Sequence, residues 1–321
     1  MTAWGVIEMD TNMIDITEAT TLKESWTFTP TTMNNGEPIK ILIAGCGGTG
    51  ARVLGPLIKI IPDDTTITLF DADVVEERNL ARQNFMPEDV GRNKAELLEE
   101  RFLLGNRVVA VTRMLDSSLL SQYLSPYRHI IVLGCTDSME FRQMMGRITN
   151  DPKLNILWID AGNERHTGQV VMEGYYPGFI TDLVNADAVT RLEIPASLFD
   201  YSRALVTNLI KWQRATRPYS SALGSPPFRL HFTGMRHYFP ELLDATAITD
   251  TPRCGERFDL QTVAVNQLAA TWMICLLANL LGGKQSSTVG VSFSTSGMSV
   301  PLRMQRPTLS PGHNYISNIN I

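Results

Sequence analysis

The sequence has little of several features that would mark a specialised class of protein. Its 321 residues include only four cysteines and five histidines. The cysteines lie far apart, with neither the paired C-x-x-C spacing of zinc knuckles nor the density of a disulfide framework. The histidines do not cluster either, so no His/Cys metal site is predicted. This cysteine usage fits a reducing compartment, and we expect a cytoplasmic protein.

Basic charge is also scarce. The net charge is −5 and the pI is near 5.6, whereas a nucleic-acid binder normally carries a basic stripe. No basic segment followed by an apolar one marks a signal peptide at the N-terminus. The apolar run 260–283 is long enough to span a bilayer, but Gln261, Asn266, Gln267 and Asn279 interrupt it. We therefore expect a buried core helix and neither nucleic-acid nor membrane partners.

What the sequence does contain is a regular alternation of apolar segments and amphipathic segments. Apolar runs, which predict strands, lie at 39–44, 65–73, 107–112, 129–137 and 155–162. Segments with helical periodicity lie between them, at 49–61, 91–104, 118–124 and 139–149. Strands that alternate with helices in this way predict an α/β fold, with a Rossmann-like, doubly wound and mostly parallel sheet.

The alternation stops after residue 168. Predicted strands at 168–176 and 228–234 and a predicted hairpin at 289–304 then indicate antiparallel C-terminal strands, with a long helix predicted at 259–282 before the hairpin. We divide the chain into four parts. They are an N-terminal arm (1–38), a nucleotide-binding core (39–175), an insertion and crossover-loop region (176–258), and a C-terminal helix and hairpin that complete the same domain (259–321).

A glycine-rich turn, GCGGTG, follows the first strand of the core. Gly45, Gly47 and Gly50 satisfy G-x-G-x-x-G, and Asp71 ends the next strand. Glycines let the backbone approach phosphate oxygens at a helix N-terminus, and an acid at that strand end can accept hydrogen bonds from a ribose. The pair predicts a nucleotide site but does not separate NAD, FAD and ATP. The alternative is a glycine turn needed only for tight helix–strand packing.

Four further residues favour a triphosphate over a dinucleotide. Asn79 and Arg82 lie one turn apart if their segment is helical, and a guanidinium there can clamp phosphate oxygens. Lys94 begins the next helix, where a cation needs an anionic partner. Asp137 follows the fourth strand and could hold Mg²⁺. Three of them have an ordinary alternative: Arg82 as a surface arginine, Lys94 as a solvated helix residue, and Asp137 as an N-cap.

The ordered motifs GxGGTG, D-x-D, N-x-x-R-Q, a lysine after a short VG turn, and C-T-D resemble those of the ThiF/MoeB-type adenylyltransferases. That superfamily includes the ubiquitin-activating enzymes, and the resemblance covers residues 40–175. It implies that the glycine loop cradles ATP, that Asp71 binds ribose, and that Asp137 organises Mg²⁺ and is central to catalysis. The nucleotide-binding residues that it implies are Gly45, Gly47, Gly48, Gly50, Asp71, Asp73, Asn79, Arg82, Gln83 and Lys94.

The C-terminal half resembles the PRTRC-system ThiF-family proteins, with a cysteine ahead of a helix that carries Gln and Asn. Some members of the superfamily transfer the activated carboxyl to a cysteine as a thioester. Cys254 is the candidate here, because Arg253 and Arg257 would favour its thiolate. The alternative is an ordinary loop cysteine. Three other cysteines are expected to be buried and structural: Cys46 in the loop, Cys135 in a strand and Cys275 in a helix.

The sequence departs from the family pattern in two places. Zinc knuckles are absent, and residues 1–40 contain no arginine, although many members supply an N-terminal arginine across a homodimer. Arg52 or Arg78 would have to take that role, or activity would be weaker. A homodimer is still implied by the resemblance.

The resemblance thus implies ATP-dependent adenylylation of a C-terminal carboxylate. The catalytic residues would be Arg82, Lys94 and Asp137, with Cys254 for the thioester step. The acceptor would be a ubiquitin-like or sulfur-carrier protein ending in glycine, and a conjugating enzyme would be a further partner. Two alternatives stay open. One is an NAD- or FAD-dependent oxidoreductase on the same fold, and the other is a scaffold that binds a ubiquitin-like partner without turnover.

Overall fold

The computed structural model describes residues 28–30, 39–102, 107–124, 129–151, 154–180, 229–244, 263–284 and 286–304. Its strands are β1 (Phe28–Pro30), β2 (Lys40–Ala44), β3 (Thr66–Phe70), β4 (Val108–Val111), β5 (Ile130–Gly134), β6 (Ile156–Asn163), β7 (Thr167–Ile180), β8 (Arg229–Thr233), β9 (Thr288–Ser294) and β10 (Ser299–Arg303). The α-helices are α2 (Gly50–Ile60), α3 (Lys94–Phe102), α4 (Ser117–Ser121), α5 (Met139–Ile148), α8 (Gly234–Tyr238) and α9 (Val263–Leu281). Short 3₁₀ turns are η1 (Glu77–Asn79), η2 (Pro87–Asp89) and η6 (Pro240–Leu243).

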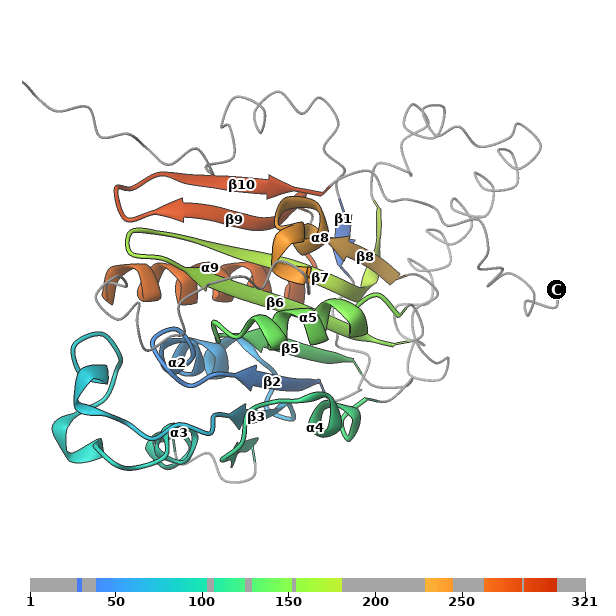
Figure 1. Ribbon diagram of the computed structural model, residues 1–321. Coiled ribbons are helices and arrows are strands. Elements are labelled where there is room, and N and C mark those ends of the chain that lie inside the picture. Colours follow the sequence, from blue (N-terminus) through green and yellow to red (C-terminus); the bar gives the residue numbers. More distant parts are fainter. Residues whose placement is uncertain are drawn as a thin grey trace, which may run out of the picture.

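These strands form one ten-stranded sheet (Figure 1). The order along its main path is β10-β9-β7-β6-β5-β2-β3-β4, and β1 and β8 both pair with β7. Strands β2 to β6 pair in parallel, with β2 between β3 and β5. The predicted doubly wound, Rossmann-like sheet is confirmed.

The strand order places a topological switch point next to β2. The chain leaves β2 toward β3 on one side, whereas β5 lies on the other side, so the connections that follow β2 and β5 diverge. In open α/β sheets, ligands bind outside the carboxyl ends of the strands at such a point. Strand β5 is buried along its whole length, as is β2 after its first residue. Helices therefore cover both faces of the sheet here, and only its carboxyl edge can present a site.

The second half of the sheet is antiparallel, as predicted. Strand β7 pairs antiparallel with β6, β8 and β9, and β9 forms a hairpin with β10. Strand β7 runs to Ile180, beyond the expected core boundary at 175, and its last residues pair with β1 from the expected N-terminal arm.

The long apolar run predicted to be helical at 259–282 forms α9 within the described residues, and 259–262 lie outside them. It contacts α2, β6, β7 and β9, and Val265, Ala269, Met273, Leu277 and Leu280 are among its buried residues. Of the described helices, α9 is the one with the length and composition that could cross a membrane. The side of α9 that packs on the sheet is buried, as expected for a core helix.

Candidate nucleotide-binding site

The glycine loop joins β2 to α2 at the carboxyl edge of the parallel strands. Gly45 has a φ of +94°, and a Cβ there would lie 2.6 Å from the Cys135 carbonyl oxygen. A Cβ on Gly50 would lie 1.9 Å from the Gly45 carbonyl oxygen. Packing alone therefore requires these two glycines. Gly47 is different, because its nearest such neighbour is the Gln83 amide at 3.4 Å. The packing-only explanation thus covers Gly45 and Gly50 but does not account for Gly47, where a Cβ would make only ordinary contact with Gln83.

Two acids follow β3 and have different surroundings. Asp71 is buried, and its Oδ2 accepts from the Cys46 N–H at 2.7 Å while its Oδ1 accepts from the Asp73 N–H at 2.8 Å. Burial raises the pKa of Asp71, and the charge of Lys94 opposes this. The Asp73 side chain is 68% exposed. Asp71 therefore braces the glycine loop against the end of β3, and Asp73 presents a carboxylate to solvent beside it.

Lys94 begins α3, as predicted, and it is buried. Its Nζ lies 2.9 Å from Asp73 Oδ2. The alternative of a solvated helix residue is therefore wrong, because the ammonium is held against the acidic end of β3. Asp73 is the anionic partner that a cation at a helix N-terminus needs.

The segment after η1 carries Asn79, Arg82 and Gln83. Asn79 Oδ1 accepts from the Glu76 N–H at 3.0 Å and so caps the turn. The backbone N–H of Arg82 and that of Gln83 both donate to the Asn79 carbonyl, which places these residues one turn apart as predicted. Arg82 is only 8% exposed, so the alternative of a surface arginine is wrong. Gln83 turns its amide toward Gly47.

Asp137 lies in the connection after β5, and its side chain is exposed. The N-cap of α5 is the next residue, Ser138, whose Oγ accepts from the Phe141 N–H at 3.1 Å. The alternative of an N-cap role for Asp137 is therefore wrong. Its carboxylate is left facing solvent at the same sheet edge as the glycine loop.

A buried ion pair behind Asp137 was not singled out from the sequence. Arg142 Nε lies 2.8 Å from Asp160 Oδ2, and both side chains are buried. The same guanidinium donates to the Thr136 carbonyl at 3.0 Å and to the carbonyls of Asp137 and Ala161. Burial raises the pKa of Asp160, and the positive charge of Arg142 opposes this. The pair fixes the backbone that carries Asp137.

The cysteines divide by environment. Cys46 is buried, and burial together with the charge of Asp71 raises its pKa. Cys135 is half-buried and follows β5, and burial raises its pKa too. Both are therefore protonated thiols with a structural role. Cys275 is exposed on α9, so the expectation that it is buried is wrong: α9 is apolar on both its packed side and its outer side. Cys254 lies outside the described residues.

The two arginines considered as substitutes for an N-terminal arginine lie in different places. Arg52 is on the first turn of α2 and donates to the Gly48 carbonyl. Arg78 is half-exposed on η1 and pairs with Glu76. Arg52 thus contacts the loop itself, whereas Arg78 lies on its outer side.

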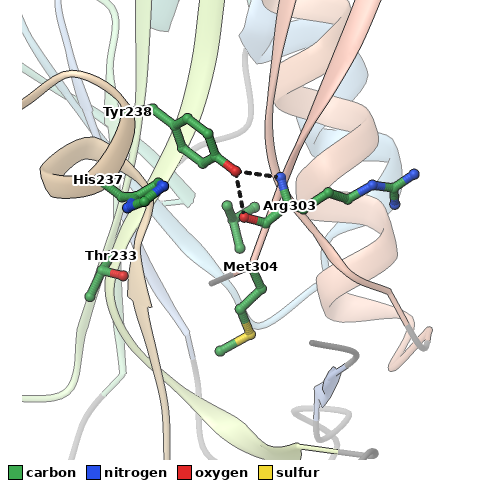
Figure 2. Close-up of a pocket in the computed structure, with 7 residues that line it drawn as sticks. Thr233, His237, Tyr238, Arg303 and Met304 are labelled. Carbon is green, nitrogen blue, oxygen red and sulfur yellow. Dashed lines mark hydrogen bonds between the residues drawn. The ribbon is translucent and has the colours of Figure 1, made fainter. Parts of the chain in front are cut away.

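A separate shallow depression lies between α8 and the β9–β10 hairpin (Figure 2). Tyr238 joins its two sides, because its hydroxyl accepts from the Arg303 N–H at 3.0 Å and donates to the Arg303 carbonyl at 2.8 Å. It is lined by Thr233, Gly234, His237, Tyr238, Val289, Arg303 and Met304. None of the predicted site residues lines it, so the candidate site is the edge of the parallel strands.

The fold is an α/β domain of the Rossmann type, with a candidate nucleotide-binding site at the carboxyl edge of its parallel strands. Residues 27–179 match the ThiF family. This match agrees with the family that the motifs predicted. The narrower likeness to PRTRC-system proteins rests in part on residues 245–262, which lie outside the described ranges, and it stays a prediction.

Comparison with individual proteins agrees with this. SUMO-activating enzyme subunit 2 of Dictyostelium discoideum is 25% identical over 142 residues, which are 43% of this chain and 21% of that protein. The chain therefore spans about a fifth of the length of this relative.

Solved structures similar to the chain include PaaA and MccB. PaaA matches with a TM-score of 0.46 and 15% identity, over 85% of this chain and 65% of its own. E. coli MccB with ATP matches with a TM-score of 0.45 and 17% identity, over 86% of this chain and 65% of its own. MccB with MccA-N7isoASN gives a TM-score of 0.47 and 16% identity, with 86% and 66% covered.

Proposed function

We propose that the protein is an ATP-dependent adenylyltransferase that activates the C-terminal carboxylate of a ubiquitin-like or sulfur-carrier protein. One observation carries the proposal. Gly47, a loop glycine that packing does not require, lies at the same sheet edge as two buried cations, Arg82 and Lys94, and one exposed carboxylate, Asp137. A dinucleotide oxidoreductase has no need of this set, whereas displacement of pyrophosphate needs its charges.

The reaction is a nucleophilic substitution at the α-phosphorus of ATP. A carboxylate oxygen of the acceptor forms a bond to that phosphorus, the bond to the bridging oxygen of the β-phosphate breaks, and pyrophosphate leaves with its electron pair. A carboxylate needs no general base. The protein therefore contributes mainly position and charge.

Each residue has a role in this scheme. The backbone at Gly47 approaches the phosphates, and Arg82 and Lys94 neutralise negative charge that develops on pyrophosphate. Asp73 has the more exposed carboxylate at the ribose position, and Asp71 holds it there through the Asp73 N–H. Arg142 keeps the Asp137 backbone in place.

Mg²⁺ fits the site through Asp137. Among the described residues no three His, Cys, Asp or Glu side chains gather into a metal-binding group. Mg²⁺ does not require one, since it commonly takes one or two carboxylates together with substrate phosphates and water. When bound, it would supply further positive charge at the phosphates. Asp137, exposed and hard in donor character, is the residue that would hold it.

A second step would use Cys254. Its thiolate would attack the acyl-adenylate carbonyl, the bond to AMP would break, and a thioester would form for a conjugating enzyme to accept. The same proposal includes a homodimer, in which one subunit would supply an arginine to the site of the other. Similarity to a SUMO-activating enzyme subunit supports a ubiquitin-like partner.

Calorimetric titration with Mg·ATP and with NAD⁺ tests the proposal first. Wild type should bind ATP, Arg82→Ala should bind it at least about tenfold more weakly because a charged hydrogen-bond donor is lost, and the exposed control Arg113→Ala should match wild type. Binding of NAD⁺ with ATP ignored would overturn the proposal in favour of an oxidoreductase.

Pyrophosphate exchange with a candidate carrier protein then tests turnover. Asp137→Asn keeps the size of the side chain and removes its charge, and it should slow exchange by about a hundredfold, the scale of losing one transition-state contact. Partner binding and ATP binding with no exchange in wild type would identify a scaffold instead.

A further inference from the structure

Three polar side chains connect the first turn of α9 to the glycine loop. Asn163, at the end of β6, donates from Nδ2 to Thr49 Oγ1 at 2.8 Å and to Asn266 Oδ1 at 3.0 Å. Asn266 then donates from Nδ2 to the carbonyl oxygen of Arg82 at 3.5 Å. The chain of contacts therefore joins the N-cap of α2, the end of the parallel sheet, the first turn of α9 and the arginine segment.

Asn266 is an unusual residue for its position. It is 1% exposed, on a helix that carries no charged residue and buries Val265 and Ala269 beside it. An amide buried among apolar groups is unfavourable unless it is hydrogen-bonded, and here both its oxygen and its nitrogen have partners. A leucine or alanine would be buried here without the cost of desolvating an amide. The contacts that account for Asn266 therefore lie outside α9.

The same side chain limits the glycine loop directly. A Cβ on Gly48 would lie 2.4 Å from Asn266 Nδ2. Any side chain at Gly48 would therefore displace the Asn266 amide. The amide packs against the loop at Gly48, and the Gln83 amide lies beside the neighbouring Gly47.

We infer that Asn266 is a positioning residue for the phosphate-binding half of the site. It fixes the spacing between the glycine loop and the Arg82 backbone, the two segments proposed to hold the phosphates. It does not reach Asp71 or Asp73, the two acids at the ribose end. The inference rests on the proposed function for its ligand, ATP.

Affinity for ATP compared with adenosine is the readout that separates this role from a general structural one. In Asn266→Ala the affinity for Mg·ATP should fall about tenfold, since one buried hydrogen-bond network is broken, while affinity for adenosine should not change. Asn279→Ala, which removes an amide near the other end of α9, is the matched control and should leave both affinities at the wild-type value. Equal losses for ATP and adenosine, or no loss for ATP, would overturn the inference.

Amide hydrogen exchange, measured without nucleotide, tests the inference independently of the proposed function. A second variant, Thr49→Val, keeps the test valid if Asn266→Ala does not fold. Asn266→Ala should speed amide exchange within residues 45–55, and Asn279→Ala should not. Thr49→Val, which keeps the side-chain shape and loses only the acceptor for Asn163, should speed it less. Unchanged exchange in both Asn266→Ala and Thr49→Val contradicts the inference, whereas failure of wild type to bind ATP contradicts the proposed function alone.

Discussion

Two buried carboxylates on neighbouring strands are each paired with an arginine, but in different surroundings. Asp160 on β6 meets Arg142, whose side chain is 7% exposed, and Glu173 on β7 meets Arg236, whose side chain is 31% exposed. Burial raises the pKa of both acids. The pKa of Glu173 reaches about 7, even though the positive charge of Arg236 opposes the shift.

The two pairs also differ in their place on the sheet. Asp160 lies where parallel strands end together, so its arginine also reaches the backbone beside Asp137. Glu173 lies within an antiparallel strand, opposite Thr233, and its arginine joins α8 to the Gly146 carbonyl of α5 (Figure 1). The first pair shapes the candidate site, whereas the second joins elements away from it. An arginine–carboxylate pair thus supports the candidate site in the parallel part of the sheet, and connects α8 to α5 in the antiparallel part.

Breaking the first pair should have the largest effect. Arg142→Met leaves Asp160 buried without its cation, and we expect the free energy of unfolding to fall by about 3–5 kcal/mol. Urea denaturation measures this, with the exposed Arg147→Ala on the same helix as the control. Equal stability of the two variants would show that the pair is not needed.

A double variant sharpens this result. Arg142→Met with Asp160→Leu removes both charges, so stability should largely return. Pyrophosphate exchange should not return, because the carbonyls of Thr136 and Asp137 still lack their donor. Recovery of exchange together with stability would contradict the positioning of Asp137 by Arg142.

The second pair should reveal itself through pH. The pKa of Glu173 is raised from an ordinary 4.5 to about 7, so the folded protein binds the proton more tightly than the unfolded chain. Glu173 taken alone should therefore make the free energy of unfolding fall by about 3 kcal/mol as the pH rises from 4.5 to 7, at about 1.4 kcal/mol per pH unit, although His231 opposes this fall in the wild-type protein. Glu173→Gln should remove this fall, which denaturation at several pH values measures against the exposed control Glu241→Gln.

His231 on the neighbouring strand acts with the opposite sign. Burial, helped by the charge of Arg236, lowers its pKa from 6.5 to about 4. The unfolded chain then binds the proton more tightly, so this group raises the free energy of unfolding as the pH rises through that range. Glu173→Gln should uncover this rise. A profile that stays parallel to wild type would contradict the assignment of the slope to Glu173.

The smallest effect is expected at Lys94 and Asp73, where only the cation is buried. Asp73→Asn keeps Lys94 near the charge of Asp71, and the lost carboxylate is already hydrated. We expect a loss of about 1 kcal/mol in urea denaturation, compared with the exposed Asp64→Asn. A loss as large as that of Arg142→Met would mean that exposure of one partner does not decide the strength of these pairs.

Much of the fold could be predicted because its signals are local. The apolar run before Gly45 and the glycine turn after it specify a buried strand and a helix start from adjacent residues. The alternation along 39–162 then defines the sheet. Side-chain exposure was harder, as Cys275 shows: an apolar helix has no polar face in its sequence that would mark its outer side.

The site divides in the same way. Gly47, Asp71, Arg82 and Lys94 belong to short motifs and could be found one by one. Partners distant in sequence could not, because a single sequence holds no record of which residues meet. Nothing in the sequence around Asp160 predicts its pairing with Arg142, and in the sequence Asn266 is only a polar residue that interrupts an apolar run. Its contacts with Asn163 and Arg82 span 103 and 184 positions.

The link between Asn266 and the glycine loop has a consequence for how the protein is made. The loop, Arg82 and Asp137 leave the ribosome well before α9 does, since synthesis runs from the N-terminus. Until α9 emerges and docks, the space above Gly48 is not filled by the Asn266 amide. Closing so long a stretch of chain is slow compared with forming local contacts. The glycine loop and the Arg82 segment are therefore joined late, when the last helix of the described chain docks against them.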